Sequence, residues 1–153
     1  MNEQLDAIFA RVKRQLEFSE VDFSDVNAVS TEGDNALHWV VSRGEVSAAK
    51  ALISAGIDIN KAGDLGYTPL HLACMKGDAE MVQLLIANGA DMFALSEGFS
   101  PFTKARICGH DNICELLAPL MREAQKHDPE VWARARIAQL KREIESLEKR
   151  SSQ

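Results

Sequence analysis

Apolar residues in this chain recur mostly at spacings of three and four, the period of an amphipathic helix. The first such run covers residues 2–18, and one face of it would carry Leu5, Ile8, Phe9, Val12 and Leu16. Shorter helical patterns then follow in pairs, over 35–43 and 46–55, 68–76 and 79–87, and 100–108 and 111–118. The pattern predicts an all-α protein built from pairs of short helices.

The paired helices belong to a sequence repeat. Residues 33–40 (GDNALHWV) align with residues 66–73 (GYTPLHLA), and Gly44 and Gly77 keep the same offset. A third unit begins at Gly98, one position short of the same offset from Gly66. A fixed period of about 33 residues indicates stacked units, each of which buries its apolar face on its neighbours.

Residues 68–73 read Thr-Pro-Leu-His-Leu-Ala, which is the T-P-L-H-x-A signature of ankyrin repeats. Val82, Leu84 and Leu85 supply the apolar stripe of a second helix, and residues 88–91 read Asn-Gly-Ala-Asp. The chain therefore resembles the ankyrin-repeat family over three units. The resemblance implies an ankyrin-repeat solenoid, in which helix-turn-helix units are joined by β-turn or hairpin loops.

This resemblance divides the chain into an ankyrin-repeat domain over 1–127 and a C-terminal amphipathic helix over 128–153. Within the domain, residues 1–24 would form the N-terminal cap, and the repeats would cover about 25–57, 58–90 and 91–127. Terminal repeats meet water on one face, so we interpret Lys104, at a usually apolar position, as a capping change. Pro119 is expected to mark a kink or a new helix start.

The C-terminal segment begins with Asp128-Pro129-Glu130, which combines a cap, a first-turn proline and an early acidic residue. A seam with alternating spacings of three and four then places Ile137, Leu140, Ile144 and Leu147 on one face, as in a heptad repeat. Two or three heptads form only a marginal coiled coil. Three arrangements remain open: pairing with a second copy or a partner, folding back on the repeats, or a solvated helix.

Composition narrows the functional classes. The chain has 153 residues, is 46% hydrophobic and has a net charge of −6, which argues against nucleic acid and anionic membranes as partners. Its first twenty residues interleave charged with apolar residues, so we expect no secretory signal, and no stretch is apolar enough to cross a membrane. Cys74, Cys108 and Cys114 form no CxxC pair and suit a reducing compartment. We therefore expect a cytoplasmic protein.

Candidate catalytic and metal-binding residues are few. His38 and His71 stand at the T-P-L-H position, where the resemblance implies a hydrogen bond between neighbouring repeats. Cys108, His110 and Cys114 supply only three of the four ligands of a structural zinc site. The sequence contains no nucleophile elbow and no phosphate-binding glycine loop. We expect no catalytic residue, no metal and no cofactor.

The resemblance implies that partners meet the turn tips and the exposed side of each first helix, which form the concave face. Through the motif, these positions are Thr31, Glu32, Asp34, Ser42, Arg43, Asp64, Leu65, Tyr67, Met75, Lys76, Glu97, Phe99 and Ile107. Aromatic and Met side chains are enriched in interface cores. Leu65, Tyr67 and Phe99 are apolar where the fold makes no evident demand, and acidic neighbours suit a basic partner.

The implied function is therefore a non-catalytic module for protein–protein interaction through the concave face. One form of it is an inhibitor, or an immunity (antidote) protein that masks a toxin. The alternative is an adaptor or assembly protein that forms a homodimer or contacts a second partner through the C-terminal helix. A structural homo-oligomer with no ligand on the concave face is the second alternative. All three forms remain open at this point.

Overall fold

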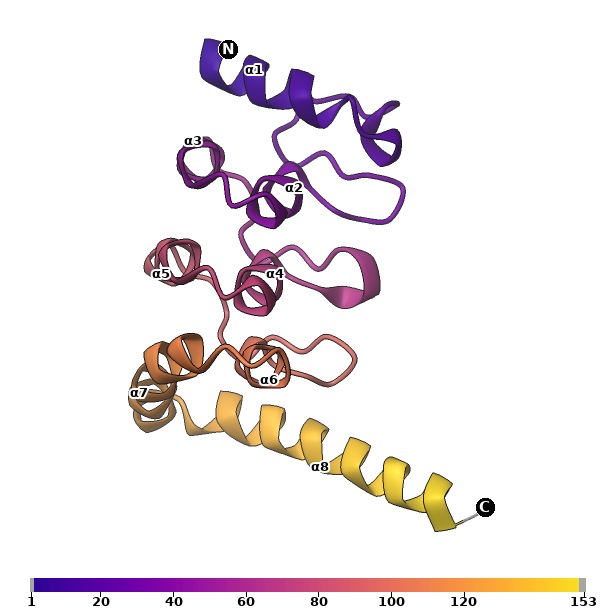
Figure 1. Cartoon of the computed structure of the whole chain (residues 1–153), viewed down its shortest axis with the longest axis vertical. Coiled ribbons are helices and arrows are strands. Elements are labelled where there is room, and N and C mark those ends of the chain that lie inside the picture. Colours follow the sequence, from indigo (N-terminus) through magenta and orange to yellow (C-terminus); the bar gives the residue numbers. More distant parts are fainter. Residues whose placement is uncertain (1, 152–153) are drawn as a thin grey trace.

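The computed structural model describes residues 2–151, without the side chains of residues 131–132, 135, 138–139, 142–143, 146–147 and 150–151. Figure 1 shows a stack of helix pairs between an N-terminal helix at one end and a long C-terminal helix at the other. In the described residues the regular structure is helical, apart from isolated β-bridges between Val29 and Asn35 and between Ser96 and Phe99. The predicted all-α solenoid is confirmed.

The elements are α1 (Glu3–Val12), η1 (Leu16–Phe18), α2 (Ala36–Ser42), α3 (Val46–Ser54), η2 (Asp64–Gly66), α4 (Pro69–Lys76), α5 (Ala79–Ala87), α6 (Pro101–Ile107), α7 (Asp111–His127) and α8 (Pro129–Ser151), where η marks a 3₁₀ turn. Helices α2, α4 and α6 form an inner row, and α3, α5 and α7 form an outer row (Figure 1). The loop before each inner helix projects away from the outer row. We call these loops finger 1 (28–35), finger 2 (61–68) and finger 3 (94–100).

Each inner helix begins where the sequence supplies a cap. The side chain of Asn35 accepts hydrogen bonds from two N–H groups in the first turn of α2, and the side chain of Ser100 accepts one in α6. Pro69 and Pro101 occupy the first turn, where a missing N–H costs no helical hydrogen bond. The five helices over residues 36–107 agree with the predicted segments to within one residue at each end.

The N-terminal helix is shorter than predicted. Helix α1 ends at Val12, and η1 follows after a turn, so the helical period no longer applies to Leu16. Phe9 and Val12 are buried, but Leu16 is 93% exposed, and the prediction that it shares their face is wrong. Phe18 is buried in its place, with its ring 6.1 Å from that of Phe23.

Pro119 does not start a new helix. It lies inside α7, which continues to His127, so the alternative of a new helix start is wrong, while the kink stays a prediction. Ile113 and Leu117 are buried and anchor the first half of α7 on the stack. Pro119 itself is exposed, so the helix carbonyl that loses its partner there is on the solvent side of the helix.

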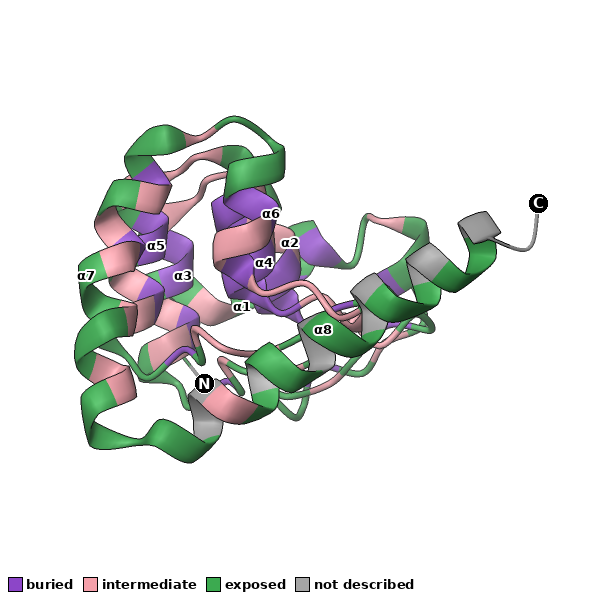
Figure 2. Cartoon of the chain, turned by 90° about the horizontal axis from the view of Figure 1, so that it is seen from below, coloured by how far each residue is buried: buried purple, intermediate pink, exposed green. Residues whose placement is uncertain are grey.

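Helix α8 begins at the predicted cap and proline, and its main contact is with α7. From there it runs beneath the finger side of the stack (Figures 1 and 2). Ile137, Leu140 and Ile144 are 52%, 41% and 54% exposed, so these seam residues do not fold back on the repeats. The side chain of Leu147 lies outside the described residues. No helix in the described part of the chain has the length and apolarity needed to span a membrane.

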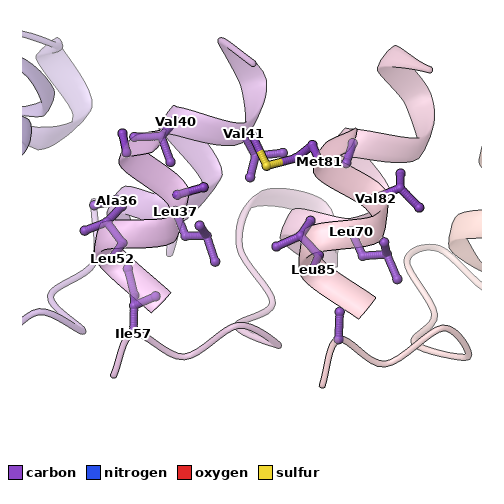
Figure 3. Packing of buried hydrophobic residues seen from close by; sticks show 14 of the residues in the cluster. Ala36, Leu37, Val40, Val41, Leu52, Ile57, Leu70, Met81, Val82 and Leu85 are labelled. Carbon is purple, nitrogen blue, oxygen red and sulfur yellow. The ribbon is translucent and has the colours of Figure 1, made fainter. Parts of the chain in front are cut away.

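The core repeats from one helix pair to the next. Leu37 and Leu70 stand at equivalent positions of successive inner helices, and Leu52 and Leu85 at equivalent positions of the outer helices. All four side chains are buried (Figure 3). Neither pair can bury its faces alone, so the stability of each unit depends on its neighbours.

The histidines of the T-P-L-H position join neighbouring units, as expected. His38 Nε2 lies 3.0 Å from the Tyr67 carbonyl oxygen, and His71 Nε2 lies 3.0 Å from that of Phe99. A carbonyl only accepts, so Nε2 donates in both cases. At His71, the N–H of Thr68 donates to Nδ1 at 3.2 Å. The imidazole is thus held as the neutral tautomer that bridges two fingers.

Two asparagines join the units on the side of the turns between them. Asn27 Oδ1 accepts from the N–H of Asp58 at 2.6 Å, and Asn60 Oδ1 accepts from the N–H of Asp91 at 2.8 Å. The Nδ2 group of Asn60 also donates to the Gly89 carbonyl at 3.0 Å. Asn27 and Asn60 stand at equivalent positions of successive repeats. The polar contacts between units therefore have the same period as the core.

We expect Leu70→Ala to lower the free energy of unfolding by about 2–5 kcal/mol, because it removes a side chain that is 1% exposed and leaves a cavity between repeats. The matched control is Leu16→Ala, the same change at a side chain that is 93% exposed, which should cost less than about 0.5 kcal/mol. Urea unfolding followed by circular dichroism measures both. Equal losses in the two variants would contradict the packing described above.

We also expect stability to fall as the pH drops below about 6.5. Burial lowers the pKa of His38 and His71 from 6.5 in the folded chain, against the opposing effects of the Asp34 carboxylate on His38 and of the Phe99 carbonyl on His71. The unfolded chain therefore binds protons first, and stability is complete above pH 6.5 and decreases below it, by at most about 1.4 kcal/mol per pH unit for each histidine.

Urea unfolding at pH 7.5, 6.5 and 5.5 tests this pH dependence. His71→Gln removes one of the two titrating imidazoles, so its stability should depend less steeply on pH over the same interval. A wild-type unfolding free energy that is constant from pH 7.5 to 5.5 would be evidence against buried neutral imidazoles.

Candidate partner-binding face

The three fingers form one continuous surface, because each contacts the next. Asp34 Oδ1 in finger 1 accepts from the N–H of Asp64 in finger 2 at 2.9 Å. The hydroxyl of Ser96 in finger 3 donates to the Leu65 carbonyl at 2.9 Å. Fingers 1 and 2 approach so closely that a Cβ at Gly63 would lie 1.8 Å from Asp34 Oδ1. The half-buried Asp34, predicted as a partner-binding residue, therefore also fixes the spacing of the fingers.

The tips of fingers 2 and 3 are tight turns with left-handed backbone. Leu65 and Gly66 have φ angles of 52° and 78°, and Glu97 and Gly98 have φ angles of 50° and 74°. Two successive positive φ angles define a type I′ turn, in which Asn or Gly is usual at the first position. A branched leucine is strained in this conformation. Leu65 is nevertheless 60% exposed, so the fold gains little from its side chain.

Lys104 is held between the rings of two adjacent fingers. Its Nζ lies 4.8 Å from the ring centroids of Tyr67 and Phe99 and donates to the Tyr67 hydroxyl at 2.7 Å. Glu97 lies 3.8 Å away as a counter-charge. A buried ammonium needs such partners because desolvation disfavours its charge. These contacts give Tyr67 and Phe99 a structural role that the sequence did not reveal.

The interpretation of Lys104 as a water-facing capping change is therefore wrong, since its side chain is buried. The sequence signal that we missed is the position of three residues within successive repeats. Tyr67 and Phe99 each follow the glycine that opens their unit, so they lie side by side in the stack. Lys104 lies one turn into α6, the helix that follows Phe99. Two neighbouring rings beside a lysine at an inner position would have indicated a cation–π contact.

The C-terminal ends of the inner helices make a second row. Lys76 Nζ, at the end of α4, donates to the carbonyl of Ser42 at the end of α2. The carbonyl of the half-buried Met75 accepts from His110 Nε2 at 2.8 Å. Ile107, at the end of α6, is 62% exposed. This row thus contains side chains that link repeats and one apolar side chain exposed to solvent.

Trp39 makes a further cluster that sequence reasoning missed. The guanidinium of Arg43 lies 5.0 Å from its ring centroid, and that of Arg11 lies 5.9 Å away. Glu45 accepts from Arg43 Nε at 3.1 Å and pairs with Arg11 at 2.9 Å. Arg43 is exposed, but these contacts hold its guanidinium beside Trp39 of α2 and Glu45 at the start of α3. The sequence signal was a tryptophan where the second unit has leucine.

The predicted partner-binding residues fall into two groups. Those with exposed side chains are Thr31, Glu32, Ser42, Arg43, Asp64, Leu65, Lys76, Glu97 and Ile107. Those that are half-buried are Asp34, Tyr67, Met75 and Phe99. The structure brings the finger residues together through finger-to-finger hydrogen bonds, and it places the residues at the helix ends in the second row.

Cys74 and His110 are both committed to the fold. Burial, with the neighbouring Cys114, raises the pKa of the Cys74 thiol to about 12, so this thiol stays protonated. His110 Nε2 carries a proton that it donates to a carbonyl, so this nitrogen is not available as a metal ligand. Among the described residues, no group of three or more His, Cys, Asp or Glu side chains is arranged to hold a metal ion.

Comparison with known proteins identifies the repeats. A family model of ankyrin repeats, with three copies, matches residues 7–96 and 56–131. Protein phosphatase 1 regulatory subunit 27 of Mus musculus is 35% identical over 72 residues, which are 47% of each chain. The ankyrin repeat-containing protein ITN1 of Arabidopsis thaliana is 31% identical over 103 residues, 66% of this chain and 17% of that protein.

The palmitoyltransferase ZDHHC13 of Mus musculus is 38% identical over 95 residues, 61% of this chain but only 15% of that enzyme, and the similarity lies in the ankyrin region. The matches thus cover about half or less of the length of these relatives. The similarity to an enzyme extends no further than its repeats, and ankyrin repeats indicate a module for protein interaction. From its three matched repeats and its stacked helix pairs, this chain belongs to the ankyrin-repeat family.

Proposed function

We propose that this chain is a non-catalytic module that binds a protein partner through the finger tips and the exposed ends of the inner helices. The observation that carries this proposal is Leu65. Its backbone is strained, its side chain is exposed, and an Asn-Gly turn would suit the fold better. Backbone strain that the fold does not need is concentrated at sites that bind another molecule.

The charges around Leu65 favour a basic partner. Glu32, Asp64 and Glu97 are exposed in the three fingers. Complementary charges speed encounter and exclude wrong partners, while an apolar centre supplies most of the binding energy. A partner with basic residues around an apolar side chain therefore fits this surface best. Ile107 provides a second apolar contact at the end of α6.

The partner's activity would be controlled by this binding. The relative from Mus musculus is by name a regulatory subunit of protein phosphatase 1, which supports an inhibitor or regulator over a passive scaffold. An antidote that masks a toxin is a member of the same functional class. We place this role in the cytoplasm, because Cys74, Cys108 and Cys114 are all free thiols and suit a reducing compartment.

An adaptor or assembly protein is the second candidate function, and the exposed seam of α8 favours it. Ile137, Leu140 and Ile144 lie on a helix whose main contact is with α7. A coiled coil or another helix-mediated contact would bury them and give the chain a second binding surface. A partner that is lost from residues 1–127 but kept by finger variants would support this function. A structural homo-oligomer would show no partner at all.

Leu65→Asn tests the leading proposal with an uncommon combination of outcomes. The variant creates an Asn-Gly type I′ turn, so its free energy of unfolding should equal or exceed that of the wild type by up to about 1 kcal/mol. Partner binding should nevertheless weaken by about 2 kcal/mol if Leu65 is a hot spot. Capture from native lysate with quantitative mass spectrometry identifies the partner, and calorimetry then measures its affinity for both chains.

The matched control is Leu16→Asn, which makes the same change at an exposed leucine outside the fingers. It should retain the captured partner at the wild-type affinity. If Leu65→Asn binds every captured protein as well as the wild type does, the finger tips are not the recognition site. If Leu65→Asn destabilises the chain, Leu65 has a role in the fold and our reading of its strain is wrong.

A further inference from the structure

A groove lies at the N-terminal end of the stack, between η1 with its following loop and finger 1. We call it the N-terminal groove. Its volume is about 400 Å³, and its lining includes the apolar Leu16, Val21 and Val29 and the acidic Glu17, Glu20 and Asp22. The groove is therefore apolar and negatively charged, and it lies away from the helix ends where Ile107 is exposed.

Leu16 is the feature of this groove that the fold does not explain. Its side chain is 93% exposed, and its neighbour Phe18 contributes the buried ring of η1 instead. Covering a leucine side chain removes apolar surface from water and so favours association. Val29 is also exposed, at 39%. The groove thus presents apolar surface that a second molecule would cover with a gain in stability.

The opposite end of the stack carries a surface of complementary character. On α8, Ile137 and Ile144 are exposed two helical turns apart, about 10 Å along the helix. Arg134 and Lys141 each lie within one turn of this seam and are exposed. Residues 129–151 contain six basic and four acidic residues, whereas the remaining chain contains eleven basic and nineteen acidic residues. Helix α8 is therefore a basic amphipathic helix on an acidic protein.

Pairing of two α8 helices makes poorer use of these charges. In a parallel heptad pair, Arg136 would stand opposite Lys141 of the other copy. In an antiparallel pair, the two copies of Lys141 would stand opposite each other, although Arg134 would then face Glu148. In the N-terminal groove, by contrast, every charged residue of the lining is acidic.

We propose that α8 of one copy docks in the N-terminal groove of a second copy. The residues that line the groove belong to η1, the loop after it and finger 1, at the N-terminal end of the stack. Helix α8 runs along the finger side at the C-terminal end (Figure 1). A second copy placed below the first in the same orientation would present its groove to α8. The two surfaces of one chain lie at opposite ends of the stack, so the contact joins different copies.

Such a contact is heterologous and leaves one groove and one helix open at the two ends of every assembly. The copies therefore continue the direction of the solenoid, and α8 serves as the joint between successive stacks. The contact between copies involves neither Leu65 nor Ile107, so it is independent of the proposed partner-binding face.

Sedimentation velocity of the purified chain over a range of concentrations, up to about 1 mM, tests the inference. The wild type should form dimers and larger species as its concentration rises, and less of them at high salt. Leu16→Ser with Glu20→Lys should weaken this association by about tenfold or more, because it removes an apolar contact and reverses a charge. Leu65→Ser, an exposed leucine on finger 2, is the matched control and should associate like the wild type.

Two variants probe the helix. Ile137→Ser with Ile144→Ser removes the seam, and Lys141→Glu alone reverses a charge while helix content, checked by circular dichroism, is retained. Each should also weaken association by about tenfold or more. A mixture of the groove variant and either helix variant should form dimers and nothing larger, because one intact helix meets one intact groove.

Three results would overturn the proposal. The first is a wild type that stays monomeric throughout, which would mean that these surfaces serve a different protein or none. The second is a groove variant that associates like the wild type while the helix variants do not, which would indicate pairing of α8 with α8. The third is a mixture of groove and helix variants in which no dimer forms.

Discussion

Each repeat of this chain requires a neighbour to satisfy its polar groups as well as its apolar ones. His38 and His71 donate to carbonyl groups in the next finger, and Asn27 and Asn60 bond to the backbone of the next turn. The repeat places each of these donors opposite an acceptor in the next unit. A displacement of one unit relative to the next would therefore leave buried donors without acceptors. The core supplies most of the stability, and the hydrogen bonds between units define a single stacking geometry.

The third unit shows what happens where that requirement ends. Thr103 replaces the histidine of the earlier units, and its hydroxyl bonds to the nearby Ser100 at 3.1 Å. Phe93 stands where the earlier units have Asn27 and Asn60. In the described residues no fourth finger or turn follows to accept a hydrogen bond, so the third unit needs neither the histidine nor the asparagine of the earlier units. The end of the solenoid is thus encoded in the residues that would otherwise have joined it to another unit.

Periodicity explains how much of this structure the sequence could predict. Helices over residues 36–107 follow local rules of capping and spacing, and a repeat applies the same rules three times, so their bounds were accurate. The predicted burial of Leu16 was wrong because the helix ends before this residue. The predicted exposure of Lys104 was wrong because the two rings that enclose its ammonium come from different fingers. The candidate site was harder to predict for the same reason. A motif identifies which positions face the surface. It does not show which of those side chains already contact a neighbouring unit.

Equivalent surface positions in the three units have in fact different tasks. Asp34 holds finger 2, whereas Tyr67 and Phe99 enclose Lys104, so these three positions are partly committed to the stack. A side chain with a structural contact can still touch a partner, but its substitution then changes two properties at once. Leu65 differs because its left-handed backbone lowers the stability of the fold and its exposed side chain contributes little packing in return. A residue that costs the fold stability is better evidence of recognition than one that the fold also uses, and the proposed binding face is therefore centred on it.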